Sequence, residues 1–104
     1  MGAHHTPVAG DFDERSVFAS FRRDGLSPVR WSNGPGDIYT SHSHNYHKVL
    51  CCLRGSITFR LEQTGEEIEL HPGDRLDIEP GTAHSAAVGS AGVECVEAAR
   101  ERRM

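Results

Sequence analysis

The sequence predicts an all-β fold of about nine short strands, which is typical of a sandwich or a barrel. Apolar and polar residues alternate with a period of two in many short segments, and no helical period persists along the chain. Eleven glycines and five prolines are spread through the sequence, as expected where many turns connect short strands. A length of 104 residues suits one domain with a small core.

The expected strands are taken here in chain order. The first covers residues 17–22, where Val17, Ala19 and Phe21 alternate with polar neighbours. Eight more are expected at residues 29–32, 38–42, 48–53, 57–61, 68–70, 76–78, 84–88 and 93–98. The run 49–53 is apolar at every position, which predicts a strand that is buried on both faces.

The residues before the first expected strand differ in character from the rest. Residues 1–14 are predicted to form an N-terminal arm, and residues 15–104 the β-barrel domain. His4 and His5 are assigned to this arm and not to a metal site. We expect a homodimer, with the segment 17–22 as a candidate strand to add to a partner's sheet.

Charge and composition exclude several classes of function. The formal net charge is -4, and no basic stripe occurs apart from the C-terminal arginines, so no nucleic-acid partner is expected. No stretch approaches the ~20 apolar residues of a membrane helix, and no apolar signal core opens the chain. We therefore expect a cytoplasmic protein without a membrane partner. Three cysteines, an odd number, predict no disulfide framework.

Three histidines have a spacing that suits a metal site. His42 and His44 are one residue apart, so on a strand they point to the same side of the sheet. His84 follows the turn Pro80-Gly81 and reaches the same point if the sheet closes on itself. Three neutral imidazoles suit a transition metal and leave positions open for water or substrate. The alternative is a set of buried histidines that are only hydrogen-bonded.

The surrounding residues resemble the two motifs of the cupin superfamily. Its first motif is a glycine, five residues, H-x-H, three or four residues, a glutamate, six residues and a glycine. Its second motif is a glycine, five residues, a proline, one residue, a glycine, two residues and a histidine. The matching residues are Gly36, His42, His44 and Gly55 for the first motif, and Gly73, Gly81 and His84 for the second.

The chain departs from these motifs at three positions. Glu79 stands where the second motif has its proline, with Pro80 in the variable place after it, and Val88 replaces an asparagine that often follows. Lys48 stands where the first motif usually has a glutamate, the fourth metal ligand. The resemblance implies a single-domain cupin-type jelly-roll β-barrel that holds one divalent transition metal ion (Zn, Fe, Mn or Ni).

The fourth ligand position has two interpretations. His47 takes the place if a turn at Asn45-Tyr46 directs it inward; otherwise it lies on the surface. Lys48 has no lone pair for a metal when protonated, but inside the cavity it favours an anionic substrate or a developing enolate. Outside the cavity, Lys48 is a rim residue whose stem packs on the barrel. The predicted metal ligands are thus His42, His44, His84 and His47.

The resemblance implies a metal-dependent enzyme that acts on a small organic molecule, with an anion among the candidates. Small cupins use such a metal for dioxygenase, isomerase, dehydratase or lyase chemistry. The alternatives are a non-catalytic module that binds or senses a small ligand or metal, and a barrel whose histidines bind nothing. Glu97 supplies a carboxylate base if its strand directs it inward. The catalytic residues and the substrate are not identified by the sequence.

Overall fold

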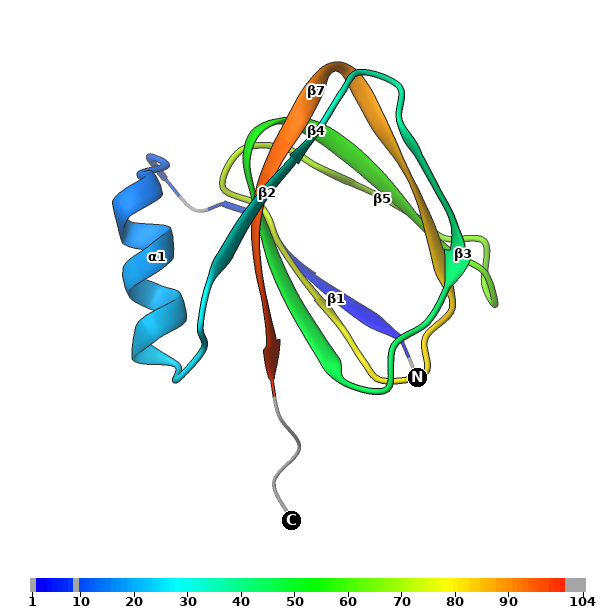
Figure 1. The fold of residues 1–104 in the computed structure, drawn as a ribbon, viewed down its shortest axis with the longest axis horizontal. Coiled ribbons are helices and arrows are strands. Elements are labelled where there is room, and N and C mark those ends of the chain that lie inside the picture. Colours follow the sequence, from blue (N-terminus) through cyan, green and yellow to red (C-terminus); the bar gives the residue numbers. More distant parts are fainter. Residues whose placement is uncertain (1, 9, 101–104) are drawn as a thin grey trace.

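The computed structural model of the protein describes residues 2–8 and 10–100. Seven strands and one helix are formed within these residues, and all strand pairs are antiparallel (Figure 1). In chain order they are β1 (Ala3–Thr6), α1 (Glu14–Arg23), β2 (Val29–Asn33), β3 (Ile38–His42), β4 (His47–Leu61), β5 (Glu67–Leu70), β6 (Arg75–Ile78) and β7 (His84–Arg100). This all-β jelly-roll architecture confirms the predicted fold class.

Two long strands run through both halves of the barrel. β4 and β7 pair from His47↔Arg100 to Leu61↔His84, and each spans two of the shorter strands expected from the sequence. The first half of β4 also pairs with β6, and its second half pairs with β5. β2 and β3 pair with opposite ends of β7. The barrel is therefore one seven-stranded sheet that folds into two halves at the bends of β4 and β7.

The bends bring the backbones of β4 and β7 so close together that a glycine is required at this point. Register shifts interrupt the β4–β7 ladder on both sides of Gly55. Gly55 has φ +73°, and a Cβ atom there would lie 1.9 Å from the carbonyl oxygen of Gly92. A larger residue would have to push the strands apart, so Gly55 is fixed by sterics as well as by backbone conformation.

Residues 17–22, predicted as a strand, lie in helix α1; this part of the sequence prediction is wrong. Asp13 caps the helix, since its carboxylate accepts a hydrogen bond from the backbone N–H of Arg15 at 3.1 Å. Glu14 lies in the first turn and two arginines in the last, which suits the helix dipole. Ala19 is exposed, whereas Phe21 is buried, so burial follows the helical period and not an alternation.

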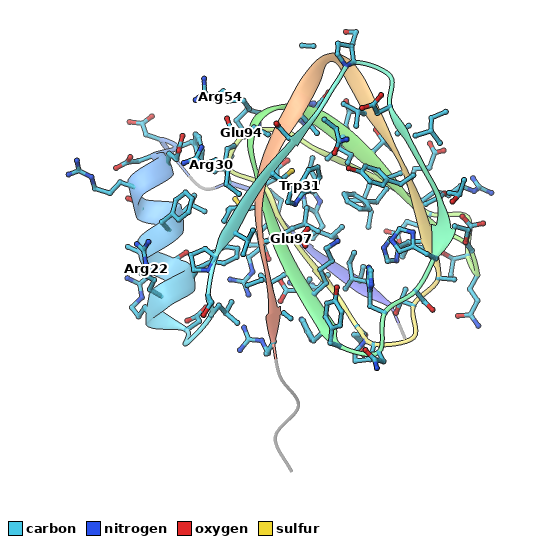
Figure 2. The ribbon with its side chains drawn as sticks, viewed as in Figure 1. Arg22, Arg30, Trp31, Arg54, Glu94 and Glu97 are labelled. Carbon is cyan, nitrogen blue, oxygen red and sulfur yellow. The ribbon has the colours of Figure 1, made fainter. Side chains whose placement is uncertain are left out.

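Helix α1 covers the outer face of one sheet (Figure 1). Its Phe21 packs in a cluster with outward-facing residues of the 49–53 run of β4, together with residues of β7. Alternate residues of the same run, Leu50 and Cys52, belong to the core inside the barrel. The prediction that this strand is buried on both faces is confirmed. Arg30 of β2 adds a polar link, bonding Glu14 of the helix and Glu94 of β7 (Figure 2).

The N-terminal residues are part of the protein's own sheet. β1 pairs with β6, from Ala3↔Ile78 to Thr6↔Arg75. His5 lies 3.5 Å from Asp74 and away from the three histidines of the predicted metal site. Within the described residues, no helix is both long enough and apolar enough to cross a membrane.

We predict that Asp74 anchors the N-terminal segment in a pH-dependent way. Its carboxylate accepts hydrogen bonds from the N–H groups of Val8 and His71, both at 3.0 Å. Burial alone would raise the pKa of Asp74, but these two bonds and the nearby His5 lower it below the ordinary 3.8. Asp74→Ala should therefore reduce the free energy of unfolding by about 2 kcal/mol at neutral pH, measured by urea unfolding.

A lowered carboxylate pKa contributes stability that is complete above the unfolded value and is lost as pH falls through the folded value. The difference between wild type and Asp74→Ala should thus shrink as pH falls below 3.8. Glu66→Ala, at an exposed position, is the control and should change stability little. A constant difference between wild type and Asp74→Ala across this pH range would contradict the anchoring role.

Candidate metal centre

The three histidines predicted from the H-x-H spacing and the distant third position meet at one point. His42 ends β3 and His84 begins β7, and the two are register partners. His44 follows in the loop after β3, where its carbonyl accepts a hydrogen bond from the N–H of Gly81 at 2.8 Å. One ligand atom from each histidine lies within 4.8 Å of the others.

Backbone hydrogen bonds define the tautomer of two of these imidazoles. Nδ1 of His42 lies 2.8 Å from the carbonyl of Thr40, and Nδ1 of His84 lies 2.8 Å from the carbonyl of Thr82. A carbonyl oxygen only accepts, so each Nδ1 carries the proton. The Nε2 atoms of His42 and His84 therefore keep the lone pair that a metal requires.

The environment of the cluster also favours neutral histidines. Nε2 of both His44 and His84 is buried and has no hydrogen-bond partner among the described residues. Burial is the main cause that lowers the pKa of His44 and His84, and the nearby Lys48 and His42 lower both further. Buried, unprotonated and unpartnered nitrogens at this separation fit a transition-metal ion.

His47 does not join this group, although it was one of the two candidates for a fourth ligand. It lies on β4 next to Lys48, and neighbouring residues of a strand point to opposite faces. Its Nε2 lies 3.0 Å from the Asp77 carboxylate of β6. Among the described residues, the candidate ligands are His42, His44 and His84.

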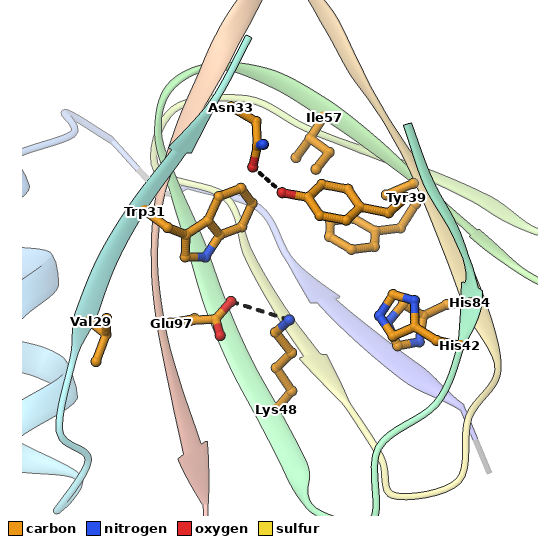
Figure 3. A pocket seen from close by; sticks show the side chains of 11 residues that line it. Val29, Trp31, Asn33, Tyr39, His42, Lys48, Ile57, His84 and Glu97 are labelled. Carbon is orange, nitrogen blue, oxygen red and sulfur yellow. Dashed lines mark hydrogen bonds and ion pairs between the residues drawn. The ribbon is translucent and has the colours of Figure 1, made fainter. Parts of the chain in front are cut away.

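Lys48 takes the inward position. It lines a cavity of about 360 Å³ together with His42 and His84 (Figure 3). Its side chain is 14% exposed, and its Nζ lies 3.2 Å from Oε1 of Glu97, which lines the same cavity. The interpretation of Lys48 as a rim residue is therefore wrong, and the conditional expectation that Glu97 faces inward is met.

The cavity has an aromatic wall that the sequence motifs did not indicate. Trp31 of β2 packs edge-on against Tyr39 of β3, with ring centroids 6.1 Å apart and an interplanar angle of 76°. The Tyr39 hydroxyl donates a hydrogen bond to Asn33 (Figure 3). Phe59 of β4 also lines the cavity. The sequence signal that could have indicated this wall is the alternation of side chains within β2, because it places Trp31 and Asn33 on the same face of the strand.

The three cysteines do not contribute to this centre. All are free and buried. Cys51 faces helix α1, and burial raises the pKa of its thiol to about 12. Cys52 and Cys95 are cross-strand neighbours in the core of the barrel. They act as small apolar residues in the packing.

A jelly-roll barrel with one histidine at the end of β3, a second in the loop after it and a third on the facing strand β7 has the arrangement of a cupin-type candidate metal site. The sequence model of the Cupin domain matches residues 29–97, so the chain belongs to the cupin superfamily. It is 39% identical over 85 residues to the quercetin 2,3-dioxygenase of Bacillus subtilis (strain 168). That match covers 80% of this chain but only 25% of the relative's length.

Solved structures share the fold at low sequence identity. A protein of unknown function from Rhizobium leguminosarum has a TM-score of 0.67 at 14% identity, covering 83% of this chain and 92% of that one. A cupin superfamily protein from Desulfitobacterium hafniense DCB-2 has a TM-score of 0.62 at 14% identity, and the match covers 95% of this chain and 78% of that one. A DMSP lyase from Ruegeria pomeroyi has a TM-score of 0.66 at 21% identity, and the match covers 73% of this chain and 38% of that one. These similarities concern the fold alone.

We predict about one divalent transition metal ion per chain in protein purified without an affinity tag. Replacing His42 and His84 together by alanine should remove the metal, because two of three imidazole ligands are lost. His47→Ala should leave the metal content unchanged, since that side chain bonds Asp77 instead. Elemental analysis measures both outcomes. An empty wild-type site after incubation with Zn, Fe, Mn and Ni would contradict the prediction.

Proposed function

We propose that the protein is a metal-dependent enzyme that acts on a small anionic organic molecule. One observation carries this proposal: His42 and His84, two of the three clustered histidines, line a cavity of about 360 Å³ that also contains a lysine and a carboxylate, and Nε2 of His84 has no hydrogen-bond partner among the described residues. A structural metal site is usually closed by four protein ligands, whereas three described ligands leave room for a substrate.

The roles of the residues follow from their chemistry. A metal bound by His42, His44 and His84 would supply Lewis-acid polarisation of a substrate oxygen. Lys48 places a positive charge beside the bound molecule, which favours an anion. Glu97 is positioned to take a proton from the substrate or to return it. The apolar wall excludes water from part of the cavity.

Dioxygenation is the first reaction class to test. The support is the 39% identity to a protein named quercetin 2,3-dioxygenase, although this chain spans a quarter of that protein's length. The geometry also suits isomerase, dehydratase and lyase chemistry, because these reactions need a polarised carbonyl and a nearby base.

The decisive experiment loads the protein separately with Fe, Mn, Ni and Zn and measures oxygen uptake and substrate loss with quercetin and related enols. We expect turnover with at least one metal. Glu97→Gln should lower kcat by roughly 10²- to 10⁴-fold with the metal still bound, as for loss of a general base. Glu69→Gln, at an exposed position, should have no such effect. Metal-loaded protein that turns over none of these substrates would contradict the dioxygenase class.

A non-catalytic binding module is the second candidate. The observation that favours it is the Lys48–Glu97 ion pair, which engages the one carboxylate found among the described lining residues. In that case quercetin or the metal should bind without turnover, and Glu97→Gln should change affinity alone.

We also propose a homodimer, for a reason other than the one expected from sequence. The segment 17–22 is helical and does not add a strand to a partner. β2, however, pairs with β7 alone among the described strands, and its Val29 is 61% exposed. An open edge of this kind favours pairing between copies. Light scattering at micromolar concentration should give a dimer mass; a monomer mass would contradict the proposal. The cytoplasmic location and the absence of nucleic-acid and membrane partners stay predictions.

A further inference from the structure

We propose that the cavity is built for a small aromatic monocarboxylate. Its carboxylate would lie between the ammonium group of Lys48 and the indole N–H of Trp31, and its ring would lie against the apolar wall. The inference deepens the proposed function, on which it rests, by naming the class of substrate for the same cavity.

Two hydrogen-bond donors converge on one side of the cavity. Nε1 of Trp31 is buried and has no hydrogen-bond partner among the described residues. Figure 3 shows the nitrogen edge of the Trp31 ring turned toward Glu97 and Lys48. A buried donor without an acceptor is costly, and a ligand oxygen placed there would satisfy it. One oxygen of a carboxylate can accept from Trp31 while the other meets Lys48.

The charges of the cavity select a single negative charge. Among the described lining residues there is one full positive charge, Lys48, and one negative charge, Glu97. A phosphate dianion would meet more repulsion from Glu97 than a carboxylate. A neutral ligand would leave Lys48 with no new partner.

Glu97 acts as a competitor for the ligand carboxylate. It lies 3.2 Å from Lys48, which is the one cation within ion-pair distance of it in the described part of the chain. An incoming carboxylate must share Lys48 or displace Glu97 from it. The two members of the pair therefore have opposite effects on anion binding, which a purely structural ion pair would not have.

The other side of the cavity is apolar and aromatic. Ile57 is 1% exposed and Phe59 is 4% exposed, and both line the cavity beside Tyr39. Trp31 and Tyr39 already form an edge-to-face pair. Aromatic rings prefer such edge-to-face or offset contacts, so a flat ligand ring fits this wall better than a polyhydroxylated chain. A volume of about 360 Å³ lies at the small end of ligand pockets, which suits a small ligand with one ring.

The test uses the fluorescence of Trp31, the single tryptophan of the chain. Benzoate, phenylacetate, acetate, benzyl alcohol and inorganic phosphate are titrated into metal-free and zinc-loaded protein. We expect saturable binding of benzoate or phenylacetate, at least tenfold tighter than acetate, benzyl alcohol or phosphate, in the metal-free protein. Acetate or benzyl alcohol binding as tightly as the aromatic acids would overturn the proposal, and so would preferred binding of phosphate.

Matched variants test the charge pair. Lys48→Met should weaken benzoate binding at least tenfold, Lys48→Arg should retain it, and Glu97→Gln should tighten it severalfold. A change in the same direction for Lys48→Met and Glu97→Gln would overturn the proposal. If Lys48→Met does not fold, as judged by circular dichroism, Lys48→Arg and Glu97→Gln against wild type decide the question.

Metal content measured on the same samples separates the two proposals. Benzoate binding by a protein that takes up no metal supports this inference and contradicts the metal-dependent function. A metal-loaded protein that binds none of the aromatic acids contradicts this inference and leaves the metal-dependent function standing.

Discussion

The cavity depends on a switch, within the β4–β7 ladder, between the even-numbered and the odd-numbered residues that point into the barrel. In the first half of β4, Lys48, Leu50 and Cys52 point into the barrel, whereas Ile57, Phe59 and Leu61 point inward in the second half. The inward positions are thus even before the bend and odd after it. β7 shows the matching change, from His84 and Ala86 to Cys95 and Glu97. A ladder without bulges would keep one parity and direct either Lys48 or Phe59 outward. The close approach of Gly55 to Gly92 is where this change occurs.

The same constraint explains which features could be predicted from the sequence. Alternation gave the all-β class and the approximate strand positions, because sheet burial has a period of two. The three clustered histidines could be found from H-x-H and one distant histidine, because a closed sheet brings these positions together. Their metal binding stays a prediction. Nine strands were expected and seven are described, because β4 and β7 each continue through a bend and join two expected strands, residues 17–22 are helical, and β1 was not expected.

Other features depend on tertiary contacts that local patterns do not contain. Val17, Ala19 and Phe21 alternate as in a strand, but Asp13 caps a helix and Phe21 docks on the outer face of β4. Packing therefore overrode the apparent period. The choice between His47 and Lys48 required the parity of β4, which the loop at Asn45-Tyr46 leaves open. The aromatic wall was missed because neither Trp31 nor Tyr39 occupies a motif position, although their rings meet edge-to-face.

The polar groups of the cavity compensate one another electrostatically. A buried lysine is unfavourable without a partner, and its charge opposes both imidazole protonation and a nearby metal cation. Glu97 lies 3.2 Å from Lys48 and offsets part of its charge. Burial is the main cause that lowers the pKa of His44 and His84; Lys48 lowers both further, and Glu97 partly opposes this at His44.

The two sides of the cavity are also supported in different ways. Lys48 and Glu97 lie on the half of the β4–β7 ladder whose outer face is covered by α1, so their backbone positions are fixed by packing on both faces. The histidines lie at strand ends, where the Gly81–His44 hydrogen bond ties the loop after β3 to the turn before β7. Two of the three candidate ligands, His42 and His84, line the cavity together with Lys48 and Trp31. A metal held by these histidines would therefore lie beside the cavity that Lys48 and Trp31 line, as the proposed substrate site requires.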